Sequence, residues 1–178
     1  MTYYGSKELA AAFRTVRSNT IQVAQDIPED KYGFKPAPEC KTIAQMLAHI
    51  GVGTGFQHYI QSNTVTDLGK VNFMALMQKL TAEENKPRTK AELVAFLKEE
   101  GDKFAAFLET LSEPFLAEHV TMHPGASPAT RSRFEMLLSP KEHEMHHRAQ
   151  LMTIERMIGV TPHLTRQQQE RMAHAAKP

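Results

Sequence analysis

Residues 139–158 predict a long amphipathic helix, and this helix constrains the fold of the chain more than any other stretch. Ser139 is suited to cap it, Pro140 to occupy its first turn, and Glu142 to complete a capping box. No glycine or proline follows until Gly159, so the predicted helix continues unbroken to residue 158.

Two histidines lie on the apolar face of this predicted helix. At about 100° per residue, His147 lies about 40° from His143, with Gln150 and Ile154 on the same stripe. An i, i+4 pair of imidazoles can bind one small cation. Such pairs often have no function, but a buried imidazole needs a partner for each ring nitrogen, which strengthens the metal hypothesis here. His146 lies about 60° from His143, at the edge of the stripe, and is predicted to flank the pair.

A third histidine is predicted to face inward from another helix. Thr42 and Gln45 form a second capping box, which opens a helix expected to reach residue 61. Projected at about 100° per residue, Gln45, His49 and Gly53 share one face of this helix. Gly53 either makes room for a ligand or allows a close contact between helices, and the contact is the preferred interpretation.

Two further long helices complete the pattern. Residues 6–27 carry apolar side chains alternately four and three apart, which is typical of a bundle helix that opens with a serine cap. Residues 89–111 open with a third capping box. Shorter helical stretches are expected at residues 71–80 and 130–138. The sequence therefore predicts an all-α fold, a four-helix bundle with long crossover connections.

His119 and His123 are a competing pair, also four residues apart. The residues between them favour a β-strand, in which this spacing corresponds to roughly 13 Å, too far for one ion. His49, His143 and His147 are instead predicted to hold one divalent ion per chain, zinc or nickel in preference to iron or manganese. Three neutral imidazoles leave coordination positions open, as in catalytic sites, where the ion can lower the pKa of a bound water or thiol.

Composition excludes several classes of protein. The net charge of the 178 residues is +1 and the basic side chains are dispersed, so no nucleic-acid partner is expected. No apolar run approaches the roughly eighteen residues that cross a bilayer, and no signal peptide is visible, so no membrane association is expected. The single cysteine, Cys40, excludes an internal disulfide and indicates a reducing, cytoplasmic location. One domain over residues 1–178 is expected, with its core at about 6–162 and a polar tail at 163–178.

Four stretches match the motifs of a known family. They are residues 34–39, 43–50, 143–151 and 159–162, which read FKPAPE, IAQMLAHI, HEMHHRAQL and GVTP. Through them the chain resembles the DinB/YfiT-like family of metal-binding four-helix bundles over roughly residues 6–162. The resemblance maps the metal ligands of the family onto His49, His143 and His147. Ala149 stands where the family motif often has glycine, a change that does not touch the ligands.

The resemblance implies function only in outline. Members of the family are typically dimers, and they include metal-dependent transferases that use low-molecular-weight thiols, a maleylpyruvate isomerase and proteins taken to be hydrolases. The expectation is an enzyme whose metal activates a thiol or water against a small electrophilic substrate. The alternative is a non-catalytic, stress-inducible metal-binding protein, which a fourth protein ligand would favour.

Other side chains near the predicted ligands receive provisional roles. The candidates for contacting the ligands or lining the pocket are Gln45, Gly53, His146 and Gln150. No catalytic residue is assigned: Glu142 or Glu144 could accept a proton, but each lies about 100° from the ligand direction and is expected to be solvated.

The side of the predicted helix opposite its histidines carries a second apolar group. Met145, Ala149 and Met152 follow the i, i+4, i+7 spacing of a helix contact. Together with the resemblance, this face predicts a two-fold homodimer.

Overall fold

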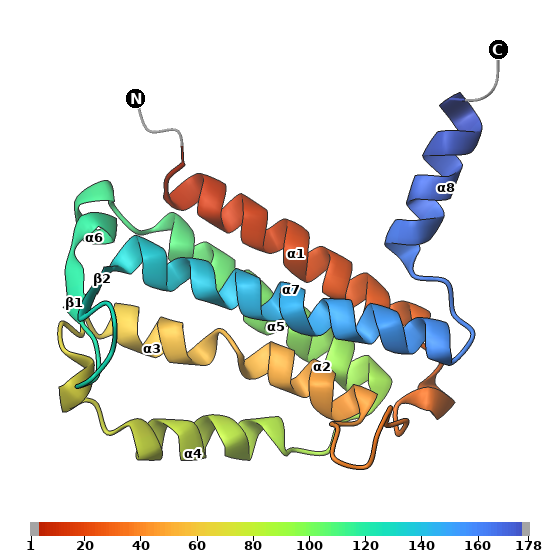
Figure 1. Ribbon diagram of the computed structural model, residues 1–178, viewed down its shortest axis with the longest axis horizontal. Helices are drawn as coiled ribbons and strands as arrows, with labels where there is room; N and C mark the ends of the chain where they lie inside the picture. Colours follow the sequence, from red (N-terminus) through yellow and green to blue (C-terminus); the bar gives the residue numbers. More distant parts are fainter. Residues whose placement is uncertain (1–3, 176–178) are drawn as a thin grey trace.

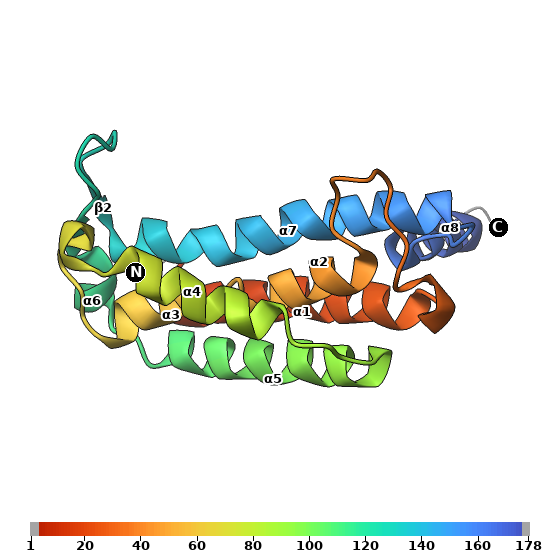
Figure 2. The ribbon, with the colours of Figure 1, turned by 90° about the horizontal axis from the view of Figure 1, so that it is seen from below.

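Four long helical segments lie side by side and form the body of the protein (Figure 1). The computed structural model describes residues 4–175. The segments are α1 (Ser6–Asp26), α2 (Ile43–Val52) continued by α3 (Gly55–Ser62), α5 (Lys90–Glu109) and α7 (Arg133–Met157). Helices α1 and α2 each pack against both α5 and α7, so α5 and α7 occupy opposite sides of the bundle (Figure 2). The predicted all-α four-helix bundle is confirmed.

A long crossover sets the direction of the helices. Helix α4 runs back along the outside of α2 and α3, so α2 and α5 point the same way (Figures 1 and 2). The remaining elements are η1 (Glu29–Lys31), η2 (Leu68–Lys70), α4 (Phe73–Glu84), α6 (Glu113–Ala117), β1 (His119–Thr121), β2 (Thr130–Ser132) and α8 (His163–Ala175).

Side-chain caps fix where the helices begin. The hydroxyls of Thr42 and Thr89 accept hydrogen bonds from backbone N–H groups three residues on, as predicted for α2 and α5. In α1 the cap lies one residue earlier than predicted, at Gly5, whose N–H donates to the Glu8 carboxylate. The predicted apolar seam of α1 is buried throughout: Leu9, Phe13, Val16, Thr20, Val23 and Ile27.

The predicted continuous helix over residues 42–61 is wrong, because the chain forms two helices there. The N–H of Gly53 donates to the carbonyl of Ile50, three residues back instead of four, and α2 ends at Val52. Glycines at positions 51, 53 and 55 weaken the helix at this point, since glycine loses more backbone entropy than any other residue.

The helix start predicted at Ser139 is also wrong. Helix α7 begins at Arg133, and the Ser132 hydroxyl and the Glu135 carboxylate form its capping box. Pro140 lies inside the helix and is buried, although an interior proline removes one helical hydrogen bond. Both serines fit a cap, and the earlier one is used because the residues between them already carry core side chains.

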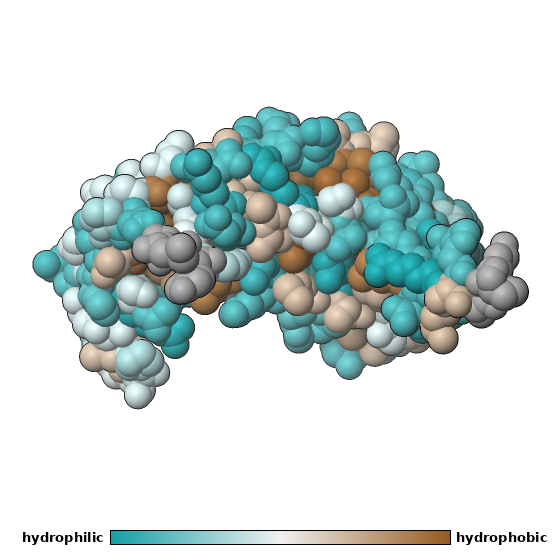
Figure 3. All heavy atoms as spheres, turned by 90° about the horizontal axis from the view of Figure 1, so that it is seen from above, coloured by the Kyte–Doolittle hydropathy of each residue, from teal (hydrophilic) through white to brown (hydrophobic). Residues whose placement is uncertain are grey.

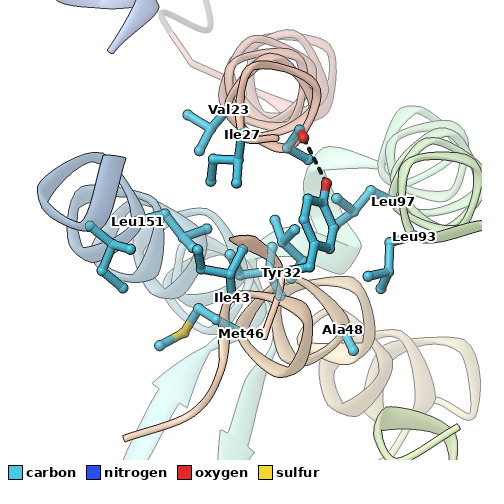
Figure 4. Packing of buried hydrophobic residues seen from close by; sticks show 13 residues of the cluster. Val23, Ile27, Tyr32, Ile43, Met46, Ala48, Leu93, Leu97 and Leu151 are labelled. Atoms are coloured by element: carbon cyan, nitrogen blue, oxygen red, sulfur yellow. Dashed lines mark hydrogen bonds between the residues drawn. The ribbon is translucent and has the colours of Figure 1, made fainter. Parts of the chain in front are cut away.

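The largest cluster of buried apolar side chains joins the end of α1 to the start of α2 (Figure 4). Ile27, Ile43, Leu97 and Leu151 bring all four segments of the bundle into contact there. Tyr32 enters the same cluster from the intervening loop, and its hydroxyl donates to the carbonyl of Ala24 at 2.6 Å. This packing fixes the start of α2, less than two turns before His49.

The competing histidine pair lies away from the bundle core, in the small hairpin. Strands β1 and β2 are antiparallel, with His119 opposite Ser132. His119 is exposed, and the ring of His123 packs edge-on against Phe73 with 5.8 Å between centroids. The predicted strand is confirmed, and the described residues place neither histidine with the other three.

Helix α8 contains most of the predicted polar tail and projects from the bundle (Figure 1). Gly159, with φ of +83°, ends α7 in the left-handed conformation that glycine adopts without strain. No helix among residues 4–175 is long and apolar enough to cross a membrane. The face of the molecule in Figure 3 is mostly hydrophilic, with separate apolar patches.

Candidate metal centre

Three histidine side chains converge between α2 and α7. His49 Nε2 lies 3.0 Å from His143 Nε2, which lies 3.2 Å from His147 Nε2. One ligand nitrogen from each of the three rings lies within 4.8 Å of the other two. Nitrogens that share a tetrahedral zinc ion are about 3.3 Å apart. The i, i+4 spacing on α7 and the inward position on α2 therefore bring the predicted ligands together.

Acceptors outside the cluster fix which ring nitrogens carry protons. His49 Nδ1 lies 2.8 Å from a carboxylate oxygen of Glu84, and His147 Nδ1 lies 2.8 Å from Oε1 of Gln150. These oxygens only accept, so each Nδ1 carries the hydrogen and each Nε2 directs a lone pair inward. Inward lone pairs on neutral imidazoles are the donors that a divalent metal requires, so the residues present fit such an ion.

His143 sits at the centre of the cluster, against the break between α2 and α3. A side chain at Gly53 would place its Cβ 2.9 Å from His143 Nδ1, so only glycine leaves room for this ring. Burial is the main cause that lowers the pKa of His143 to about 4, and the neighbouring rings of His147 and His49 lower it further. Burial also lowers the pKa of His147. Both rings are therefore neutral, and able to bind a metal, at neutral pH.

Glu84 contacts a predicted ligand, His49, and was not predicted from the sequence. It ends α4, and its carboxylate joins Lys41 and His49 through hydrogen bonds on its two oxygens. Burial raises the pKa of Glu84, but the bonds from Lys41 and His49 outweigh burial, and the pKa lies below its ordinary value. One signal was available: Glu83 and Glu84 both end a helix, where negative charge is unfavourable without a partner elsewhere.

The other candidate side chains divide into those that contact the histidines and those that do not. Gln150 contacts His147 and also His146 Nε2, at 3.2 Å. His146 is exposed and flanks the pair, as predicted. Gln45 turns away from the site, because its side chain accepts the N–H of Thr42 in the capping box.

The expectation of a solvated Glu144 is wrong. Its carboxylate is buried and accepts hydrogen bonds of 2.9 and 3.0 Å from Arg17 Nε, while Glu142 is exposed as expected. Arg17 also donates to the carbonyl of Leu97 at 2.6 Å. A Cβ at Gly101 would lie 2.6 Å from the Arg17 side chain, so this glycine makes room for the arginine.

The arrangement offers three nitrogen ligands and an incomplete coordination shell. Within the described part of the chain, no fourth histidine, cysteine or carboxylate joins the group. Three protein ligands with free positions are typical of catalytic metal sites, whereas structural zinc sites are closed by four.

The sequence pattern of the DinB superfamily matches residues 12–151 of this chain. YjoA of Bacillus subtilis (strain 168), an uncharacterized protein, is 24% identical over 156 residues, which span 88% of this chain and 92% of YjoA.

Solved structures share the fold. The DinB-like protein YjoA has a TM-score of 0.65 at 21% identity, covering 86% of this chain and 94% of its own. YfiT from Bacillus subtilis, described as a probable metal-dependent hydrolase with an unusual four-helix bundle topology, has a TM-score of 0.66 at 14% identity, covering 90% and 91%. A mycothiol-dependent maleylpyruvate isomerase has a TM-score of 0.61 at 14% identity, covering 85% of this chain and 63% of the isomerase. At these identities the likeness shows the fold alone.

Proposed function

Because the chain belongs to the DinB superfamily and directs three imidazole nitrogens at one point, we propose that it is a divalent-metal-dependent enzyme. It acts with a thiol or water on a small electrophilic substrate, as a thiol transferase or a hydrolase. The observation that carries this proposal is the convergence of one nitrogen from each of three rings, with the outer nitrogens of His49 and His147 held by Glu84 and Gln150.

Each residue of the site has a defined part. His49, His143 and His147 would hold the ion, with zinc or nickel expected. A bound divalent ion supplies Lewis acidity to a small molecule beside it. Glu84 and Gln150 orient two of the rings by accepting their Nδ1–H groups.

Two observations favour an enzyme over a non-catalytic metal-binding protein. The coordination shell offered by the described side chains is incomplete, which leaves room for a substrate. Two proteins with this fold carry names that refer to catalysis, the probable hydrolase YfiT and the maleylpyruvate isomerase. Fold alone does not transfer a reaction, so the incomplete shell is the stronger support.

A screen of tag-free protein tests the proposal. Metal-loaded protein is offered 1-chloro-2,4-dinitrobenzene with glutathione, cysteine or coenzyme A, and 4-nitrophenyl acetate with water. We expect turnover in at least one assay that a chelator abolishes and zinc or nickel restores, and that His143→Ala lacks. Metal-loaded protein without turnover in either reaction class would instead identify a non-catalytic metal-binding protein.

A further inference from the structure

A mostly apolar cavity opens beside the three histidines. Its volume is about 430 Å³, within the usual range of small-molecule sites. The loop before α2 forms one wall, through Pro36 and Cys40, and the C-terminal half of α7 forms another, through Ile154 and Met157. Met46 of α2 contributes a flexible thioether, which adapts to ligands of different shape.

The polar groups of the cavity belong to the side chains that support the histidines. Lys41, His147 and Gln150 line it. His147 and Gln150 bond each other at 2.8 Å, and Lys41 pairs with the Glu84 carboxylate that accepts the Nδ1–H of His49. The polar wall of the cavity is therefore the wall nearest the candidate metal centre.

The hydrogen-bond donors on this wall suit an anion. Among the described residues that line the cavity, Lys41 is the one charged side chain and none is acidic. Lys41 donates to the Glu84 carboxylate, and an ammonium group has three N–H donors, so donors remain for a bound anion. A divalent ion held by the three histidines would add positive charge to the same side.

We propose that this cavity binds a small molecule with an apolar body and one carboxylate, the carboxylate facing Lys41 and the histidines, the body lying against Ile154 and Met157. The inference rests on the proposed function and specifies its substrate class. Low-molecular-weight thiols are polar throughout, so the apolar walls suit the electrophile rather than the thiol.

Octanoate is the probe, with 1-octanol and octylamine as the matched neutral and cationic molecules. Calorimetry of the zinc-loaded protein should show octanoate binding at least about tenfold more tightly than either, because a charge-assisted hydrogen bond to Lys41 is lost in both. Lys41→Gln should weaken the binding of octanoate and leave the binding of 1-octanol nearly unchanged, so that the preference for octanoate narrows. Equal binding of octanoate and 1-octanol by the wild type, or no binding of octanoate, would overturn the proposal.

Cys40 gives a second readout, because it lines the cavity and is the one cysteine of the chain. Octanoate should slow its alkylation by N-ethylmaleimide, as measured by mass spectrometry. Thr153→Phe, which fills the cavity from an exposed position of α7, should abolish octanoate binding. The matched control Ser139→Phe, exposed on the same helix, should bind as the wild type does. Loss in both variants, or in neither, would contradict the location.

Metal content and turnover, measured in the same samples, separate this inference from the proposed function. Metal-dependent turnover without octanoate binding would overturn the cavity assignment alone. Octanoate binding that Thr153→Phe removes, in protein without metal-dependent turnover, would support the cavity and overturn the enzyme.

Discussion

At the scale of single residues, the outer nitrogens of the histidines decide whether three adjacent rings form a ligand set. Glu84 and Gln150 accept the Nδ1–H groups of His49 and His147. Without its acceptor a ring can rotate or move its proton to Nε2, and a protonated Nε2 cannot bind a metal. Metal affinity is therefore expected to depend on side chains that would not touch the ion.

Replacing Glu84 tests this dependence. Glu84→Leu should weaken zinc binding by about 10–100-fold, measured by competition with a chelator, because His49 loses its acceptor. Glu84→Gln should recover much of the affinity, since its amide oxygen can still accept the Nδ1–H. The control is Glu83→Leu, because Glu83 pairs with Lys86 and Arg88 instead. Wild-type affinity in Glu84→Leu would show that His49 needs no support.

The ligands could be predicted from the sequence, whereas their supports could not. His143 and His147 follow from one helical period, and His49 from a capping box that sets the phase of its helix. Glu84 reaches His49 because the crossover helix α4 lies along the outside of α2. No local pattern encodes that placement, because it depends on how the long connections pack.

At the scale of elements, a buried ion pair anchors α7 to α1. The side chains of Arg17 and Glu144 are 4% and 2% exposed. Glu144 directly follows His143, so the same bond sets the rotation of α7 and the direction of its histidines. The sequence predicted neither the burial of Arg17, which lies outside the apolar seam of α1, nor its partner.

Glu144→Gln should destabilise the metal-free protein by about 3–5 kcal/mol, because it leaves the Arg17 charge buried without a counter-ion. Urea unfolding at pH 7 measures this loss. Glu142→Gln, at an exposed neighbouring position, should change the free energy of unfolding by no more than about 0.5 kcal/mol. If Glu144→Gln lowered the free energy of unfolding no more than Glu142→Gln does, the ion pair of Arg17 and Glu144 would not anchor α7.

A second buried carboxylate makes stability depend on pH. Neither oxygen of Glu155 has a hydrogen-bond partner among the described residues. Burial, and next the Asp26 carboxylate, raise the pKa of Glu155 from 4.5 to about 7, against the opposing effect of Arg166. Between these values the folded protein holds a proton that the unfolded chain has lost, so this contribution to stability falls as pH rises through that window.

Glu155→Gln should remove this contribution. The stability of the wild type relative to the variant should fall between pH 5 and pH 8, with a slope of at most about 1.4 kcal/mol per pH unit. Burial lowers the pKa of His163, which gives an opposite slope, but that slope is present in both proteins and cancels in the difference. A difference that stays constant with pH would show that Glu155 is already ionised in the folded protein.

Helix boundaries were harder to predict than helices. Ser132 and Ser139 each precede a glutamate by three residues, so each could form a capping box. The local sequence does not show which of the two serines begins the helix. The tertiary contacts of residues 133–138 make the earlier start favourable despite Pro140. Gly53 likewise leaves room for the ring of His143, a residue from a distant part of the chain.

At the scale of the whole molecule, the homodimer remains a proposal. Met145 is 43% exposed and Ala149 is exposed, as the predicted contact on α7 requires. Met152 is partly buried against the largest core cluster, so it contributes less to a surface than expected. The wild type should sediment as a dimer and Met145→Glu as a monomer. Met172→Glu, on the exposed side of α8, is the control and should remain dimeric. A monomeric wild type would contradict the interface.

The metal content of tag-free protein tests the central claim most directly. Wild-type protein, and the control His119→Ala in the hairpin, should each hold about one divalent ion per chain after loading and desalting, because three imidazole nitrogens converge between α2 and α7. His49→Ala should lose most of the ion while remaining folded. Full metal content in His49→Ala, or a wild type that retains none, would contradict a metal centre built from His49, His143 and His147.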